Sequence, residues 1–315
     1  MIKIQGSGYL KRFFLLCSLL IAHCSFVNAV SFRYAIIPEN PRPGEPVTVG
    51  VNNSSGAKTV ALLSDGKRLA RSAFFNVPAE DGKPQFMAAV LPVPSTAKPG
   101  AVTVVFEAAN GILGEVLIEI GKRDFVSEVI ELTPALTGVR TAPDPQKNAE
   151  SARLQAIINH TGNEILCYGN FTPPVSSTRR TSFFGDRRVY KYSTGSSDTA
   201  IHAGIDYGVP KGTVVGSCGP GKVVLARSRI VTGNSVVIEH LPGVYSLYYH
   251  LDKIEIEEGA VVAAGTPLGL SGATGLATGP HLHWEIRVSG ENSDPDAFIA
   301  RPILDKEAIL SKLNN

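Results

Sequence analysis

The sequence predicts a mainly β protein made of two modules joined by a short helical linker. The chain has 315 residues, more than one domain of ordinary size contains. Its 31 glycines and 21 prolines supply many turns, and short runs of alternating apolar and polar residues lie between those turns. This combination favours short strands over long helices. We therefore expect two β modules, each with its own core.

The first 29 residues are typical of a signal peptide. The basic pair Lys11-Arg12 precedes a short apolar run, and Val27-Asn28-Ala29 offers small residues at a cleavage position. The apolar run is roughly half of the ~20 residues that a membrane-spanning helix needs, so we expect cleavage and no transmembrane segment in the mature chain. An uncleaved anchor and a lipid on Cys24 are the alternatives. The protein is expected in the periplasm or attached to the cell envelope.

The charge of the mature chain argues against nucleic acid as a partner. Cleavage after residue 29 removes three basic residues and no acidic ones, so the 30 basic side chains fall to 27 against 28 acidic ones. Binding to a phosphate backbone needs clustered Lys and Arg. The two local pairs, Arg179-Arg180 and Arg187-Arg188, are interpreted as a solvated rim of the protein.

Residues 30–122 are predicted to fold as an immunoglobulin-like β-sandwich. Turn dipeptides at Pro43-Gly44, Asp65-Gly66 and Asn110-Gly111 separate short strand-like runs. The likeness is one of pattern alone, because the segment lacks the Cys and Trp core residues of immunoglobulin domains. It also contains no His, so we expect it to bind an envelope protein or the wall, or to act as a spacer.

Residues 123–164 are predicted to be a linker that contains a helix. Asp144-Pro145 is typical of an N-cap followed by proline at the first helical position. Leu154 and Ile158 then share one helical face. We expect this helix to pack on a neighbouring element; a regulatory helix that covers an active cleft is the alternative.

Residues 165–302 return to short strands separated by glycine turns, which predicts an antiparallel sheet. Residues 303–315 are expected to form a helical tail that caps this module. The mature chain keeps Cys167 and Cys218. An even pair in an oxidising compartment favours a disulfide, but two separate buried thiols fit the sequence equally well.

Three motifs in the C-terminal module contain residues typical of a metal site. His202-Ala-Gly-Ile-Asp206 pairs an imidazole with a carboxylate across a short segment. In His281-Leu-His283-Trp-Glu285, alternation places the three polar side chains on one strand face and the apolar ones on the other. Tyr248-Tyr-His250-Leu is a further strand-like run with one imidazole. Each motif is weak alone, and their combination is informative.

The stretch from Phe171 to Pro295, about 40% of the chain, resembles the LytM and lysostaphin-type zinc endopeptidases, which cut peptide bonds in peptidoglycan. Five motifs in order support this resemblance: Phe184-Gly-Asp-Arg-Arg188, His202-Ala-Gly-Ile-Asp206-Tyr-Gly, Gly233-Asn-Ser-Val-Val-Ile-Glu-His240, Leu247-Tyr-Tyr-His250-Leu, and Gly272-Ala-Thr-Gly275 leading into Thr278-Gly-Pro-His281-Leu-His283. The implied fold is an antiparallel LytM-type peptidase domain.

The resemblance also implies the site residues. The family pattern makes His202, Asp206 and His283 the metal ligands, and it makes His250 and His281 the catalytic pair. Two imidazole nitrogens and one carboxylate oxygen suit zinc. The chain has no His-Glu-x-x-His motif, so a histidine pair would replace a glutamate base. Which histidine acts as acid and which as base stays open.

The predicted function is therefore hydrolysis of peptide bonds in peptidoglycan stem peptides or cross-links, with one zinc ion per chain. One alternative is an inactive LytM-like regulator that binds a cell-wall amidase or peptidoglycan, although such relatives typically lose metal ligands. Another is a carrier domain, because the segment from Glu258 to Gly269 has the strand-turn pattern of biotinyl and lipoyl domains. That segment contains no lysine to carry the group.

Other polar residues have simpler interpretations. Glu285 either hydrogen-bonds a ligand histidine or is an exposed strand acid. His160 and His240 are expected to be structural or surface residues. Ser217 and Ser271 have no evident base partner, so neither is expected to be a nucleophile.

Overall fold

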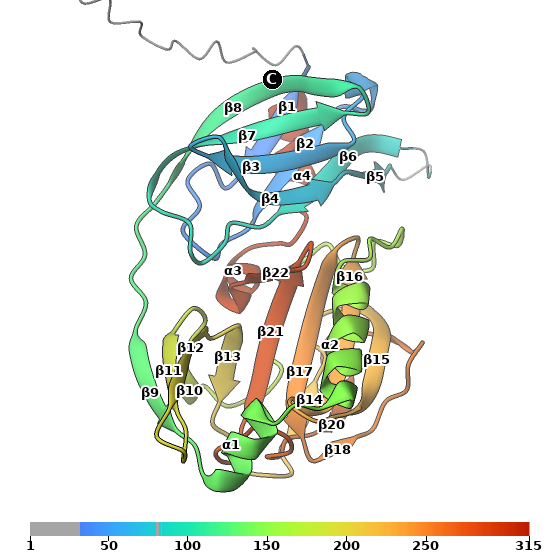
Figure 1. The fold of residues 1–315 in the computed structure, drawn as a ribbon. Helices are drawn as coiled ribbons and strands as arrows, with labels where there is room; N and C mark the ends of the chain where they lie inside the picture. Colours follow the sequence, from blue (N-terminus) through green and yellow to red (C-terminus); the bar gives the residue numbers. More distant parts are fainter. Residues whose placement is uncertain (1–31, 80–81, 83, 315) are drawn as a thin grey trace, which may run out of the picture.

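The computed structural model describes residues 32–79, 82 and 84–314. Strands dominate both modules, which confirms the predicted mainly β class. In Figure 1 the N-terminal module lies above the C-terminal module, and the end of the chain returns to the N-terminal module.

The N-terminal module consists of two four-stranded antiparallel sheets that share one core. One sheet has the order β1 (Tyr34–Ile37), β2 (Val47–Val51), β6 (Pro84–Leu91) and β5 (Phe75–Pro78), and the other has the order β4 (Lys67–Ala73), β3 (Thr59–Ser64), β7 (Gly100–Ala108) and β8 (Gly111–Ile120). A short 3-10 turn, η1 (Asn53–Ser55), precedes β3. Val49 and Leu91 from the first sheet pack with Val60 and Phe106 from the second. The immunoglobulin-like assignment stays a prediction.

The predicted turn at Asp65-Gly66 joins β3 to β4. Both residues have positive φ, 48° and 72°, as the two-residue turns that match the twist of a hairpin require. Glycine adopts this conformation without steric cost, which explains why the dipeptide could be recognised in the sequence.

Between the modules lie β9 (Ser127–Glu131), α1 (Pro134–Thr141) and α2 (Pro145–Ile158). The α2 helix begins where the sequence predicted, since the Asp144 carboxylate accepts a hydrogen bond from the backbone N–H of Gln146 at 2.7 Å. Leu154 and Ile158 are buried against Leu225 and Leu247 of the large sheet described below. Figure 1 shows α2 lying along that sheet, so it is a packed helix and not a cover for a cleft.

Strand β9 is an element that the sequence analysis did not predict. It pairs in parallel with β11 (Arg187–Lys191), which in turn pairs with β12 (Ser197–Ile201). Strand β9 alternates between exposed and half-buried residues, and its partner lies about 60 residues further along the chain. The segment predicted to be a linker is thus built into the C-terminal module.

The C-terminal module is organised around one large antiparallel sheet. Its strand order is β10 (Arg180–Ser182), β13 (Gly204–Tyr207), β21 (Leu282–Val288), β17 (Val244–Leu251), β16 (Gly233–Leu241), β15 (Gly221–Arg229) and β19 (Val261–Val262), with β22 (Glu291–Ser293) paired to β21. A smaller sheet contains β14 (Val214–Gly216), β20 (Pro267–Leu270) and β18 (Lys253–Ile254). Leu282, Trp284 and Ile286 of β21 are fully buried in the core, as the alternation in this strand predicted.

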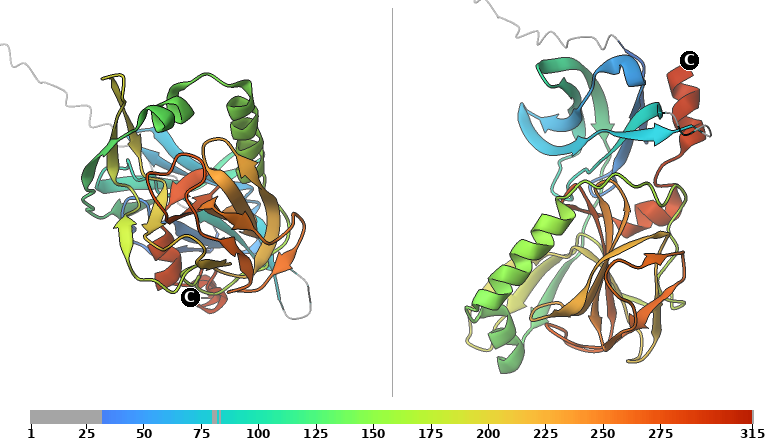
Figure 2. Two further views of the ribbon diagram at one scale, coloured as in Figure 1. Left: turned by 90° about the horizontal axis from the view of Figure 1, so that it is seen from below. Right: turned by 90° about the vertical axis from the view of Figure 1, so that its right-hand side faces the viewer.

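Two helices end the chain, α3 (Pro295–Ala300) and α4 (Lys306–Asn314). The α4 helix does not cap the C-terminal module as expected. It packs instead on β1 and β2 of the N-terminal module, where the fully buried Ile309 occupies the space that a side chain at Gly50 would fill. Arg33 Nη1 donates to the carbonyl of Leu313 at 2.9 Å. Figure 2 shows this helix beside the N-terminal sheets. An apolar helix face predicts burial but does not identify the partner.

The two modules also meet at the loop between β10 and β11. The ring of Phe184 packs against Gly44, where an added Cβ would lie 2.3 Å from the ring. Arg187 Nη2 donates to the carbonyl of Ser95 at 2.8 Å. The N-terminal module therefore contacts a loop that, as shown below, also supports a candidate metal ligand.

In the ranges that the structure describes, no helix combines the length and the apolar character needed to cross a membrane. The predicted signal peptide, residues 1–29, lies outside those ranges. Export and cleavage therefore stay predictions.

Candidate metal centre and active site

Neighbouring strands of the large sheet bring the predicted ligands together. In the pairing of β13 with β21, Asp206 lies directly opposite His283. His202 precedes β13 by two residues, and its backbone N–H donates to the carbonyl of Asp186 at 2.8 Å. Directly paired residues have Cβ atoms about 4.5–5.5 Å apart, so this register alone places two of the three side chains in contact.

Three donor atoms converge in this corner of the sheet. His202 Nε2 lies 3.2 Å from Asp206 Oδ1 and 3.0 Å from His283 Nδ1, and the last two atoms are 2.7 Å apart. All three side chains are buried. Among the described residues, this is the group of His, Cys, Asp and Glu side chains with the spacing of a metal site. Tetrahedral zinc places its ligand atoms roughly 3.4 Å apart, so a small expansion fits the ion.

The remaining polar atoms of the two histidine ligands are also bonded. His202 Nδ1 lies 2.7 Å from the carbonyl of Phe183, and His283 Nε2 lies 2.9 Å from Glu285 Oε1. A carbonyl or carboxylate oxygen only accepts, so these two ring nitrogens carry protons. His202 Nε2, and His283 Nδ1 once it has lost its proton, are then the ring atoms that can bind an ion at the centre. Glu285 is buried and is held in turn by Arg287 at 2.8 Å. Of the two interpretations of Glu285, the structure favours the hydrogen bond.

The electrostatics of these ligands favour a cation. Burial disfavours a charged Asp206, but His283 and His202 outweigh it and hold the pKa of this carboxyl well below its usual value. Burial likewise opposes a charged His283, but the carboxylates of Asp206 and Glu285 raise its pKa to about 9. Without a metal, a proton on His283 thus supplies positive charge between two buried carboxylates. A divalent cation at the same place supplies it directly, and the donor set fits such an ion.

The two further histidines predicted to be catalytic lie next to these ligands. His250 is the penultimate residue of β17, His281 comes just before β21, and their ring centroids are 4.8 Å apart. Nδ1 of His250 lies 2.7 Å from the carbonyl of Thr274, and Nδ1 of His281 lies 2.8 Å from that of Gly279. Both rings therefore keep Nε2 free as a proton acceptor. His281 Nε2 is 3.8 Å from Asp206 Oδ1.

Burial keeps both of these imidazoles neutral. Desolvation, together with the neighbouring His281 and His283, lowers the pKa of His250 to about 3. Desolvation also lowers the pKa of His281, although Asp206 acts in the opposite direction. Both rings are therefore uncharged at neutral pH, with no proton on Nε2.

The backbone of His250 has an unusual conformation, with φ at +61°. A residue other than glycine adopts positive φ at a cost of order 1–3 kcal/mol, and such residues cluster at functional sites. The backbone N–H of His250 donates to the carbonyl of Thr232 at 2.9 Å, and Thr274 Oγ1 donates to the carbonyl of Leu251 at 2.7 Å. These bonds hold the strand end so that the His250 ring faces His281.

The five histidine and aspartate side chains open into a pocket of about 270 Å³. Ile130, Leu132 and Arg140 form one wall of this pocket, and all three come from the segment predicted to be a linker. The guanidinium of Arg140 stacks on the ring of Tyr190 at 3.9 Å and pairs with Asp198 at 2.9 Å. The β9–α1 segment thus borders the site, whereas α2 packs away from it.

Arg188 is a site residue that the sequence analysis misjudged. It was assigned to a solvated rim, yet its side chain is only 12% exposed and its Nη2 donates to Asp206 Oδ2 at 2.6 Å. Its neighbour Arg187 points away, toward Ser95. Alternation along a strand could have indicated opposite faces for the two arginines, but only the fold reveals which one meets Asp206.

Other residues have the simple roles expected of them. His240 is fully buried, with Nδ1 2.6 Å from the carbonyl of Pro220, whereas His160 is exposed. Ser217 Oγ and Ser271 Oγ each donate to a nearby backbone carbonyl. A hydroxyl used in this way lacks the base partner of a nucleophile.

The two cysteines of the C-terminal module, Cys167 and Cys218, are buried free thiols. The structure therefore favours the second of the two alternatives left by the sequence. Burial raises the pKa of Cys167 to about 11 and that of Cys218 to about 12, so neither is an activated thiolate.

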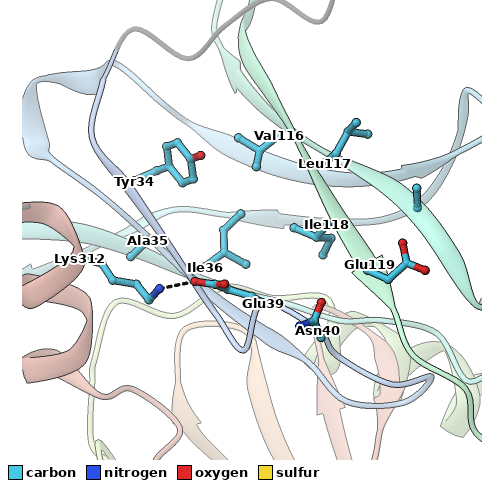
Figure 3. A pocket seen from close by; sticks show the side chains of 11 residues that line it. Tyr34, Ala35, Ile36, Glu39, Asn40, Val116, Leu117, Ile118, Glu119 and Lys312 are labelled. Carbon is cyan, nitrogen blue, oxygen red and sulfur yellow. Dashed lines mark hydrogen bonds and ion pairs between the residues drawn. The ribbon is translucent and has the colours of Figure 1, made fainter.

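A larger hollow of about 660 Å³ lies in the N-terminal module, between the edge strands β1 and β8. Figure 3 shows its mainly apolar lining, including Ile36, Leu117 and Ile118, with an ion pair between Lys312 and Glu39 at one side. None of the five predicted site residues lines this hollow. All five line the smaller pocket instead.

Residues 200–295 match the model of the family described as Peptidase family M23. The chain therefore contains an M23 domain. This domain includes all three candidate ligands and both further histidines. The predicted resemblance to LytM-type peptidases is thus confirmed for this part of the chain.

Two curated relatives of this part of the chain are named as endopeptidases. The chain is 42% identical over 164 residues to the peptidoglycan DD-endopeptidase ShyA of Vibrio cholerae serotype O1, a match that covers 46% of this chain and 37% of the relative. It is 38% identical over 122 residues to the DD-carboxypeptidase/endopeptidase Mpg of Neisseria meningitidis serogroup B, which covers 39% of this chain and 27% of the relative. The aligned part of the chain thus spans about a third of the length of each of these relatives.

One solved structure is similar over more than the M23 domain. It belongs to a Pseudomonas aeruginosa protein assigned to peptidase M23, with a TM-score of 0.56 and 25% sequence identity. The match covers 82% of this chain and 94% of that chain. The similarity therefore extends beyond residues 200–295 on this chain.

Proposed function

We propose that this protein is a zinc-dependent endopeptidase that hydrolyses peptide bonds in peptidoglycan stem peptides or cross-links. The observation that carries the proposal is the convergence of His202 Nε2, Asp206 Oδ1 and His283 Nδ1 beside two neutral imidazoles in one pocket. A relative named as a peptidoglycan DD-endopeptidase supports the choice of substrate.

In this proposal His202, Asp206 and His283 hold the zinc ion. When bound, zinc polarises a scissile carbonyl and makes a water molecule more acidic. The Nε2 atoms of His250 and His281 handle the protons: one of them takes a proton from the attacking water, and that proton then passes to the leaving amine as the peptide bond breaks. Because each Nδ1 is bonded to a backbone carbonyl, both rings are fixed with Nε2 free.

The structure supports a hydrolase rather than an inactive regulator. A regulator needs neither the three ligands nor a second pair of imidazoles, yet all five groups are present. The positive φ of His250 adds to this argument, because a binding protein gains nothing from a strained backbone at this histidine.

The proposed substrate places the protein in the cell envelope, where peptidoglycan lies. The predicted signal peptide agrees with that location. Recognition of an envelope partner or of the wall by the N-terminal module is part of the same proposal, and the β9–α1 wall of the pocket supports a role for the linker in substrate access.

The proposal is tested by incubating purified peptidoglycan sacculi with the protein, in its zinc-loaded form and after removal of metal by a chelator. The loaded protein should convert cross-linked muropeptides into uncross-linked ones, the stripped protein should not, and added zinc should restore cleavage. Cleavage by the stripped protein, or none by the loaded one, would contradict the proposal.

A further inference from the structure

A chain of polar contacts leads from strand β9 to the candidate metal centre. Glu128 Oε1 accepts hydrogen bonds from Arg188 Nε at 2.5 Å and from Ser182 Oγ at 2.9 Å. Arg188 Nη2 in turn donates to Asp206 Oδ2 at 2.6 Å and to Ser182 Oγ at 2.8 Å. The Arg188 guanidinium thus bridges a carboxylate outside the M23 domain and a carboxylate inside it.

Strand register brings Glu128 and Arg188, the first two residues in this series of contacts, together. In the parallel pairing of β9 with β11, Glu128 is the direct partner of Arg188. Other charged positions on the two strands face elsewhere: Arg187 of β11 reaches Ser95 of the N-terminal module, and the Glu131 side chain of β9 is 81% exposed. The contact between Glu128 and Arg188 is therefore specific to one position on each strand.

Burial makes the balance of charge among Glu128, Arg188 and Asp206 important. The side chains of Arg188 and Asp206 are only 12% and 9% exposed, and that of Glu128 is 28% exposed. A buried charge is costly unless it is paired and hydrogen-bonded. Without Glu128, the carboxylate that remains paired with the guanidinium would be that of Asp206, which is also a candidate ligand.

The contact with Arg188 also determines the orientation of the Asp206 carboxylate. Its Oδ2 atom is bonded to Arg188, which leaves Oδ1 directed at His202 Nε2 and His283 Nδ1. Partners that orient a ligand in this way typically affect metal affinity by 10- to 100-fold. The three ligands are then all supported: Phe183 holds His202, Glu285 holds His283, and Arg188 holds Asp206.

We propose that Glu128 and Arg188 are positioning residues of the metal centre, with Glu128 fixing the guanidinium that orients Asp206. This inference rests on the metal-dependent function proposed above. Glu128 lies outside residues 200–295, so the β9 segment completes the support of the site instead of merely connecting two modules.

The test measures the zinc affinity of the full chain by competition with a chromophoric chelator. Glu128→Gln and Arg188→Met should each weaken zinc binding by about tenfold or more. The matched controls are Glu131→Gln on β9 and Arg187→Met on β11, which change the same residue types on the same strands. Both controls should bind zinc within about twofold of the unchanged protein, because neither side chain takes part in the contacts that link Glu128 through Arg188 to Asp206.

Two further readouts separate positioning from a general structural effect. The visible absorption spectrum of the Co²⁺-loaded protein reports the ligand geometry, and it should change in Glu128→Gln and Arg188→Met but not in the controls. The double variant should bind zinc no more weakly than Arg188→Met alone, because Glu128 acts through Arg188. Arg188→Lys keeps the charge and should recover part of the affinity, and it replaces Arg188→Met if that variant does not fold.

The outcomes distinguish this inference from the proposed function. Failure of the unchanged protein to bind zinc would overturn the proposed function. If the unchanged protein binds zinc, and Glu128→Gln and the Arg188 variants bind it with the same affinity as the unchanged protein, only the positioning role is overturned. Losses that multiply in the double variant would show that Glu128 acts independently of Arg188, which contradicts the inference.

Discussion

Replacement of His250 by alanine should slow the chemical step without removing the metal. The side chain contributes no atom to the convergent donor set, and its Nδ1 is bonded to the carbonyl of Thr274. Its free Nε2 lies beside His281, with 4.8 Å between the ring centroids. His250→Ala therefore removes a proton carrier and leaves the three ligands in place.

The expected size of the effect follows from this geometry. A positioned acid or base contributes roughly 10²- to 10⁴-fold to a rate, which corresponds to about 3–5 kcal/mol in the activation barrier. We expect a decrease in kcat of that size, with little change in KM, because a proton is transferred only in the reaction. If His250 and His281 act as a unit, the double alanine variant should be little slower than either single variant.

The assay is the rate of cleavage of cross-linked muropeptides, together with the zinc content of each variant. His160→Ala is the control, since His160 is exposed and is not part of the pocket lining. It should retain full activity. A His250→Ala protein that keeps its zinc and cleaves within threefold of the normal rate would refute the proton-transfer role. Loss of zinc from this variant would mean that His250 belongs to the ligand set.

Three other outcomes are expected. Glu285→Gln should weaken zinc binding about 10- to 100-fold in a chelator competition, because it weakens the bond that orients His283, and unchanged affinity would contradict this. Ile309→Ala should lower the free energy of unfolding by about 2–5 kcal/mol in denaturant titrations, since α4 buries this side chain fully, and a loss below about 0.5 kcal/mol would mean that α4 is not docked. A chain that starts at residue 30 should show two reactive thiols when it is denatured without reductant, and none would reveal a disulfide between Cys167 and Cys218.

Local sequence rules predicted the elements that local physics determines. Asp65-Gly66 identified a turn because both residues adopt positive φ. Asp144-Pro145 identified the start of α2 because the carboxylate accepts a hydrogen bond from the backbone N–H of Gln146. The alternation around Trp284 identified a strand with one apolar face. These signals need no information about distant parts of the chain.

Elements whose stability depends on distant partners were missed or misplaced. Strand β9 is short and half-exposed, and it is a strand because it pairs with β11, about 60 residues further along the chain. A helical tail at residues 303–315 was expected, but the contact of Ile309 with Gly50 was not. In both cases the local sequence does not identify the distant segment against which the element packs.

The candidate site shows the same division. The residue types and spacing of His202, Asp206 and His283 could be recognised in the sequence, and the structure brings them together as neighbours. The role of Arg188 could not be recognised, because it depends on which face of β11 turns toward β13. Glu128 was not considered, since it lies in a segment that carried no motif.

The central claim is that His202, Asp206 and His283 hold one metal ion. The most direct measurement is the zinc content of the purified chain and of His283→Ala, with His160→Ala as the control. The claim predicts about one zinc per chain in the unchanged protein and in the control, and close to none in His283→Ala, because a three-ligand site that loses one ligand binds weakly. Stoichiometric zinc in a folded His283→Ala protein would contradict it.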